Sequence, residues 1–270
     1  DSASAPLLRS AAHQKNPSVS LAGTGYTVVW TESRGASSAI IGTHVDASGA
    51  PVGPRFVVAA NVGPVEPPEI SCSIDSCLVV WTDRSVPDQK LVWARLVGLQ
   101  GEEKGAPLVV SEPDAASPVV GFDGTQWWVV FHSDHGSVRS RRISADGLLL
   151  DQDDLDAPPA PAGSKLTIAC RINRNDCLVA LVGTDSRSHR ARLSQSGNVQ
   201  WSSSQDTVNR VNAALGSNGS DYLVVSGEGH GCVGCVDQLN GILDAVRFDE
   251  NAAEKKRMVL SGARRLNLAP

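Results

Sequence analysis

Acidic side chains recur at one position of the sequence, shortly after a run of apolar residues. The runs include Val28-Val29-Trp30 and Leu78-Val79-Val80-Trp81. The five acids are Glu32, Asp83, Asp134, Asp185 and Glu228. Carboxylates gathered on one face can hold a cation or accept hydrogen bonds from sugar hydroxyls, and two of them about 5 to 9.5 Å apart can cleave a glycosidic bond. Each acid can also serve only its own turn by accepting backbone N–H groups. We treat the five as ligand-binding candidates and assign no catalytic residue.

The six cysteines form three pairs that are close in sequence. The pairs are Cys72 with Cys77, Cys170 with Cys177, and Cys232 with Cys235. An even, locally paired set is typical of disulfides, which persist in oxidising compartments. We therefore expect three disulfides and a secreted or cell-surface protein.

A metal site is the alternative for the third cysteine pair. His230 precedes Cys232 and Cys235, and Asp237 follows them, so this segment holds four residues of the types that bind zinc. A second Cys-x-x-Cys motif is absent, and two further disulfides are expected. A disulfide that braces a long loop is therefore the favoured interpretation, and we expect no cofactor.

The elements that must position these residues repeat along the chain. Five equivalent positions follow one another at steps of 51, 50, 50 and 45 residues: Trp30, Trp81, Phe131, Leu181 and Ser226. Each repeat has four strand-length runs separated by turn residues, although the last run of the third repeat is degenerate near Leu148. The second run is apolar nearly throughout, as expected for a middle strand with both faces covered. This pattern predicts the blades of a β-propeller.

The predicted fold is all-β, with five four-stranded repeats. We place them at residues 16–66, 67–116, 117–163, 164–210 and 211–265. Residues 1–15 look like an outer-strand segment, and residues 266–270 like the start of a further repeat. A section of a larger propeller or β-repeat array is the alternative. A two-layer sandwich or an open β-solenoid accounts less well for the repeat.

The repeats resemble those of tandem propeller proteins that bacteria secrete or carry on their surface. The shared unit is a proline, an apolar strand, an Asp-Gly turn, an aromatic strand, and an Arg-apolar-Ser-Ala-x-Gly corner, as in Pro118 to Phe131 and Arg142 to Gly147. The resemblance covers about residues 5–270 and implies an architecture without a particular ligand. More remotely, the units look like those of five-bladed sugar-binding propellers of the tachylectin type, from which no sugar-site motif carries over.

Charge and hydropathy exclude two classes of partner. The formal net charge is −5 and the isoelectric point is about 5.7, so the chain lacks a basic field for nucleic acid. Apolar runs stop after a few residues, far short of the roughly 20 that cross a bilayer. We expect neither a nucleic-acid partner nor a membrane span.

The sequence carries no nucleophile elbow, zinc-protease helix or phosphate-binding loop. Variable loops on a rigid repeat favour recognition. We therefore predict a non-catalytic extracellular binding module, or a structural subunit of a surface assembly, with a protein partner or a larger parent assembly. The alternatives are a lectin-like propeller that binds a glycan and a glycoside hydrolase that uses paired carboxylates on one face.

The cysteine pairing can be tested by mass spectrometry. If all six cysteines are oxidised, the unreduced chain is lighter than the reduced chain by six hydrogens, about 6 Da. Free thiols at Cys72 and Cys77 would contradict the argument for an oxidising compartment.

Overall fold

A computed structural model gives the structure of the chain. It describes residues 12–34, 37–63, 66–85, 89–133, 136–150, 164–182, 187–195, 199–205, 210–228, 243–249 and 254–261. The chain divides into two compact units, residues 1–135 with 139–154, and residues 136–138 with 155–270. Among the described residues, we find no helix with the length and apolar character needed to cross a membrane.

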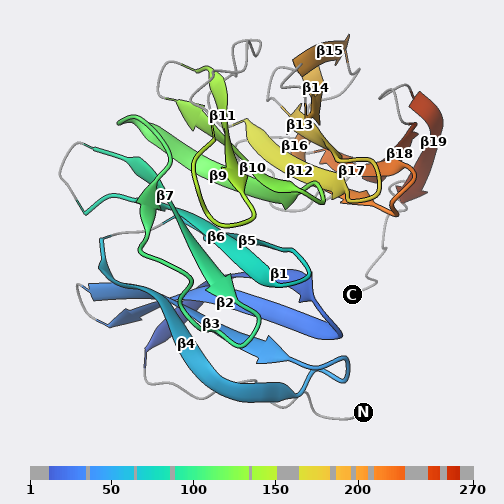
Figure 1. Ribbon diagram of the computed structural model, residues 1–270. Helices are drawn as coiled ribbons and strands as arrows, with labels where there is room; N and C mark the ends of the chain where they lie inside the picture. The colour runs from blue at the N-terminus through green and yellow to red at the C-terminus, as the bar shows by residue number, and fades with distance from the viewer. Residues whose placement is uncertain are drawn as a thin grey trace, which may run out of the picture. The chain divides into compact units, whose positions relative to one another are not determined.

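The first unit contains three antiparallel sheets whose strands follow chain order (Figure 1). The first sheet consists of β1 (His13–Ala22), β2 (Gly25–Arg34), β3 (Ser37–Val45) and β4 (Pro51–Val62). The second consists of β5 (Glu69–Cys72), β6 (Ser76–Asp83), β7 (Leu91–Gly98) and β8 (Leu108–Val109). The third consists of β9 (Ala115–Phe122), β10 (Gln126–Ser133) and β11 (Val138–Ser144).

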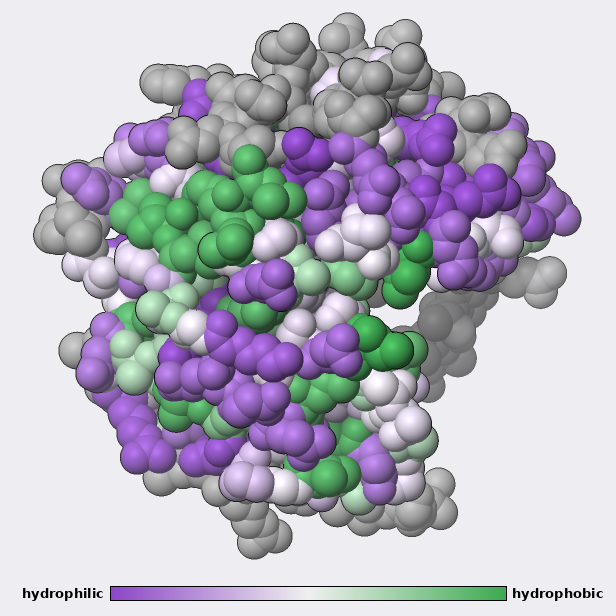
Figure 2. Space-filling view, viewed as in Figure 1, coloured by the Kyte–Doolittle hydropathy of each residue, from purple (hydrophilic) through white to green (hydrophobic). Residues whose placement is uncertain are grey.

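The third sheet has three strands and an isolated bridge between Ile143 and Leu149 in place of a regular fourth strand. This agrees with the degenerate run that the sequence shows near Leu148. Leu148 and Leu150, beside the bridge, are exposed. Figure 2 shows apolar surface on the side of the first unit that holds β9 and β11.

The second unit contains two four-stranded antiparallel sheets, again in chain order. One consists of β12 (Lys165–Arg171), β13 (Asp176–Val182), β14 (Arg187–Ser194) and β15 (Val199–Gln205). The other consists of β16 (Arg210–Ser217), β17 (Tyr222–Glu228), β18 (Leu243–Phe248) and β19 (Glu254–Ser261). The repeated antiparallel sheet confirms the all-β prediction, and its four strands in chain order have the form of a propeller blade.

The second strand of a sheet packs against neighbours on both faces, which explains its unbroken apolar sequence. In β6, Leu78 and Val80 face a core that contains Val129 and Phe131 of β10. Val79 and Trp81, which alternate with them, face a core that contains Val29 of β2. Burial of an aliphatic side chain of this size contributes about 1.5–3 kcal/mol, so these interfaces dominate the stability of the unit.

Two of the predicted disulfides are present, and each joins the first two strands of a sheet. Cys72 of β5 lies opposite Cys77 of β6, and Cys170 of β12 lies opposite Cys177 of β13. Each bond therefore braces a hairpin, as the sequence predicted. Cys232 and Cys235 lie outside the described residues.

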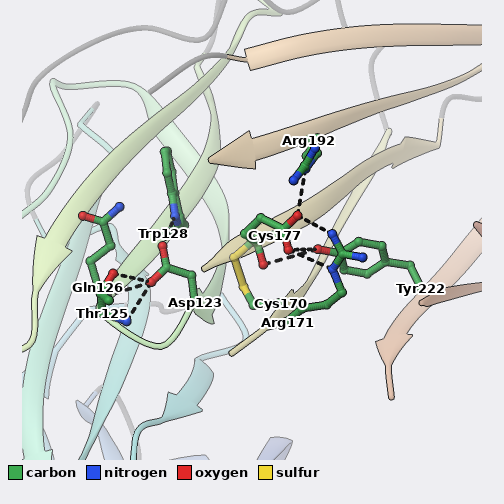
Figure 3. The surroundings of a disulfide bond; sticks show 10 residues. Asp123, Thr125, Gln126, Trp128, Cys170, Arg171, Cys177, Arg192 and Tyr222 are labelled. Atoms are coloured by element: carbon green, nitrogen blue, oxygen red, sulfur yellow. Dashed lines mark hydrogen bonds and ion pairs between the residues drawn. A yellow bond between two sulfur atoms is a disulfide. The ribbon is translucent and has the colours of Figure 1, made fainter. Parts of the chain in front are cut away.

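A buried ionic network joins the two sheets of the second unit beside the Cys170–Cys177 disulfide (Figure 3). The guanidinium group of Arg171 donates from Nε to Asp176 Oδ1 at 2.8 Å and also binds Oδ2. Tyr222, on the next sheet, donates its hydroxyl to Asp176 Oδ1 at 2.9 Å. Arg192 donates from Nε to Asp176 Oδ2 at 2.7 Å. All except Arg192 are 0–1% exposed, so Asp176 is a buried carboxylate held by three donors.

Asp176→Asn should destabilise the second unit by about 3–5 kcal/mol, because it leaves the buried Arg171 cation without its counter-charge. Burial alone would raise the pKa of Asp176, but hydrogen bonds from Arg171, Tyr222 and Arg192 outweigh burial and hold the pKa below its usual value. The stabilisation is therefore present at neutral pH and is lost as the pH falls through the folded-state pKa. Urea unfolding, monitored by circular dichroism, measures the free energy of unfolding of each variant. Asp75→Asn, at an exposed carboxylate, is the matched control, and equal stability of the two variants would contradict the prediction.

Candidate active site

Glu32, the first of the predicted ligand-binding acids, is almost fully buried at the end of β2. Arg34 donates to its Oε1 at 3.1 Å, and Arg55 of β4 donates to its Oε2 at 2.9 Å. Two cations thus neutralise the carboxylate and tie the second strand to the fourth.

Asp83 occupies the equivalent place at the end of β6. Its Oδ1 accepts backbone N–H groups from Ser85 at 2.8 Å and Gly63 at 3.3 Å. The carboxylate therefore holds the turn that follows its strand. Ligand binding by Glu32 and Asp83 stays a prediction.

The remaining predicted site residues fall wholly or partly outside the described part of the chain. Asp134, Asp185, His230, Cys232, Cys235 and Asp237 lie outside it, and Glu228 is described only as part of β17. Among the described residues, no group of three or more His, Cys, Asp or Glu side chains is arranged to hold a metal ion.

Two other carboxylates lie beside the start of β5, the first strand of the second sheet: Glu69 is the first residue of the strand and Glu66 precedes it. They are three residues apart in the chain, and both are partly buried. We call them the β5 carboxyl pair. Sequence reasoning missed them because it sought features common to all repeats.

The two neighbouring sheets hold the pair from opposite sides. Ser18 of β1 donates its hydroxyl to Glu69 Oε2 at 3.0 Å. Ser117 of β9 donates to Glu66 Oε2 from its backbone N–H at 2.9 Å and from its hydroxyl at 3.2 Å. The start of β5 thus lies between contacts from the first and third sheets.

Among the residues that the structure describes, no cation pairs with Glu69. Its described partner is the Ser18 hydroxyl. Burial raises the pKa of Glu69, and the Ser18 hydrogen bond only partly opposes that shift. The side chain therefore retains its proton to a higher pH than an ordinary glutamate.

Glu66 has the opposite environment. Arg84 pairs with Oε1, and Thr82 donates its hydroxyl to Oε2 at 3.1 Å. Burial alone would raise the pKa of Glu66, but the hydrogen bonds from Arg84, Ser117 and Thr82 outweigh it and lower the pKa. Glu66 therefore ionises more readily than Glu69.

Backbone irregularities place the two serines. The pairing of β1 with β2 shifts register between Lys15 and Ser18, and Asn16 has a φ of 56°. The pairing of β9 with β10 shifts at the same end of the sheet, where Ser117 has a φ of 54°. Such bulges redirect side chains and are frequent beside active sites. Here they bring Ser18 and Ser117 to the carboxyl pair.

The two carboxyl groups, three residues apart in the chain, have pKa values moved in opposite directions, which suits acid–base chemistry. The protonated group can give a proton to a leaving oxygen, while the ionised one stabilises positive charge or activates water. The sequence does hold a signal for this pair. Glu66-Pro67-Pro68-Glu69 is acidic where the first repeat has Pro17-Ser18 and the third has Pro118-Val119.

No family model and no curated protein matches the sequence, but solved structures do. The chain is similar to an α-L-arabinofuranosidase from Lactobacillus brevis, with 8% identity, a TM-score of 0.53, and coverage of 90% of this chain and 93% of that one. The GH43_1 enzyme from Xanthomonas citri, complexed with xylose, gives 8% identity, a TM-score of 0.51, and coverage of 83% and 84%. AofleA from Arthrobotrys oligospora gives 10% identity, a TM-score of 0.52, and coverage of 91% and 71%.

These likenesses confirm the predicted β-propeller fold. They also contradict the prediction of a non-catalytic binding module or structural subunit, because the first two structures are those of glycoside hydrolases. The expectation that the chain is not an enzyme is corrected accordingly, because the structures that the fold resembles favour the glycoside hydrolase alternative. At 8% identity the likeness shows the fold, so the residues of a site have to be found in this chain.

Glu69→Gln should stabilise the fold at neutral pH while it keeps an oxygen that accepts the Ser18 hydrogen bond. Because the folded state raises the pKa of Glu69, ionisation opposes folding as the pH rises above the unfolded-state value. The advantage of the variant should therefore be absent at low pH and grow as the pH rises through the folded-state pKa. Urea unfolding at intervals of roughly one pH unit from pH 4 to 8 measures the difference in stability between the variant and the wild type. Glu112→Gln, at an exposed carboxyl, is the matched control.

Proposed function

We propose that this protein is a glycoside hydrolase in which Glu69 is the proton donor and Glu66 is the ionised carboxylate. The observation that carries the proposal is the β5 carboxyl pair, in which one group is desolvated without a cation and the other is held by Arg84. Glycosidases need one carboxyl group that is protonated at the working pH and a second that is ionised.

Glu69 suits the role of acid because its neutral form is favoured in the resting protein. A donor of this kind protonates the glycosidic oxygen as the bond to the sugar carbon breaks, which removes the need to expel an alkoxide. The partly buried Glu69 carboxyl keeps this proton without closing itself off from a substrate.

Glu66 suits the role of the second carboxylate because its donors favour the charged form. An ionised carboxylate can either activate a water molecule or attack the sugar directly, and the separation of the two groups in the substrate complex determines which. The stereochemistry of the product therefore reports the mechanism.

The substrate class follows the structures that the fold resembles. One is an α-L-arabinofuranosidase and another was solved with xylose, so we propose glycosides of pentoses as substrates. Two disulfides support action in an oxidising compartment, either secreted or at the cell surface. A glycan partner fits this function, and a protein partner stays a prediction.

The proposal predicts hydrolysis of nitrophenyl α-L-arabinofuranoside or β-D-xyloside by the purified chain. Glu69→Gln should lower kcat by about 10²- to 10⁴-fold, the usual contribution of a general acid. Because a dinitrophenolate leaves without protonation, this variant should retain far more activity on the dinitrophenyl glycoside. Glu66→Gln should lose activity on both substrates.

Glu112→Gln is the matched control and should hydrolyse both substrates as the wild type does. Unfolding curves for every variant separate lost chemistry from lost structure. Absence of hydrolysis by the wild type, or full activity of Glu69→Gln on the nitrophenyl glycosides, would overturn the proposal.

A further inference from the structure

Ser18 occupies a place in its sheet that corresponds to the place of Glu69 in the next. Ser18 lies opposite Val29, and Glu69 lies opposite Val80. In the third sheet the equivalent position is Val119, opposite Val130. The repeat therefore folds without a hydroxyl group at this position. The serine on β1 must be explained by contacts of that strand alone.

The local reason is the bond to Glu69. The bulge in β1 ends at Ser18, and the hydroxyl donates to Glu69 Oε2 across the gap between two sheets. Two residues on, Ser20 Oγ accepts the backbone N–H of Cys72 at 3.0 Å. The Ser20–Cys72 bond joins β1 to β5 without contacting the Glu69 carboxyl group. The Ser18–Glu69 bond is therefore not needed merely to hold these two strands together.

We propose that Ser18 is a positioning residue that orients the Glu69 carboxyl group for proton donation. This inference rests on the function proposed above. Because the Ser18 hydroxyl donates to Oε2, we assign the acidic proton to the other oxygen, Oε1.

In the reaction the proton passes from Oε1 to the glycosidic oxygen. The bond between that oxygen and the sugar carbon breaks, and its electron pair stays with the oxygen, which leaves as an alcohol. Water supplies the hydroxyl group that replaces it and the proton that restores the acid. Throughout, Ser18 stabilises the carboxylate that forms, as a hydrogen-bond donor does for a charged acceptor.

Few charged groups lie on the strands that pack against β5. They are His13 and Lys15 on β1, Glu32 and Arg34 on β2, and Asp83 on β6. The strand β9 carries none within Ala115–Phe122, and Glu66 belongs to the carboxyl pair itself. Glu69 makes no ion pair with any of them, so the Ser18 hydroxyl is the polar group in direct contact with its carboxyl group.

The test compares Ser18→Ala, Ser18→Thr and Ser20→Ala with the wild type. In Ser18→Ala we expect kcat to fall about tenfold with KM unchanged. We also expect the alkaline limb of the pH profile to move up by about one pH unit, which corresponds to a tenfold change in the acid dissociation constant of Glu69. Loss of a donor disfavours the carboxylate, so the shift must be upward. Ser18→Thr should restore both properties, and Ser20→Ala should alter neither.

A second readout does not require activity. The pH dependence of unfolding, taken as the difference between each Ser18 form and its Glu69→Gln counterpart, gives the folded-state pKa of Glu69. This pKa should rise in Ser18→Ala and return to the wild-type value in Ser18→Thr. If the wild type hydrolyses glycosides but neither the pKa nor the alkaline limb moves in Ser18→Ala, the role of Ser18 is overturned alone. A wild type without hydrolytic activity overturns the proposed function, and the role of Ser18 with it.

Discussion

Face-to-face packing of the second strands limits where polar side chains can lie in this protein. In β6 the even and odd residues enter different cores, so Leu78 and Val80 contact the third sheet while Val79 and Trp81 contact the first. Polar side chains can replace these residues only at a large cost in burial. The chemistry of the protein is therefore confined to strand ends and to the first strands, where side chains leave the cores.

Polar contacts join neighbouring sheets at their edges, and the residues that make them differ from sheet to sheet. In the second unit the link is a buried cluster in which Arg171 and Tyr222 bind Asp176. In the first unit, hydroxyl groups from β1 and β9 reach the carboxyl groups of β5. The first cluster is fully paired and closed to solvent, which suits a structural role. The second leaves Glu69 without a counter-ion, and a carboxyl group with a raised pKa in such a place is a functional candidate.

The acids that recur among the repeats differ from the β5 carboxyl pair in their surroundings. Glu32 and Asp83 recur at equivalent positions, and the structure gives each a local partner, two arginines in one case and backbone N–H groups in the other. Glu66 and Glu69 break the pattern, and they are the acids with opposed environments. A residue common to every repeat serves what every repeat must do, whereas a site on a repeat protein is built where one copy departs from the others.

The all-β class, the four-strand repeat, its degenerate third copy and the two hairpin disulfides could be predicted from the sequence, because they depend on local periodicity and on residues close in the chain. The partners of the acids among the described residues, by contrast, follow from contacts in space. Arg55 reaches Glu32 from two strands away, and Ser18 reaches Glu69 from 51 positions along the chain. A pKa depends on burial and on neighbours in space, and a bulge such as that at Asn16 sets where a side chain points. Neither can be read from spacing along the chain.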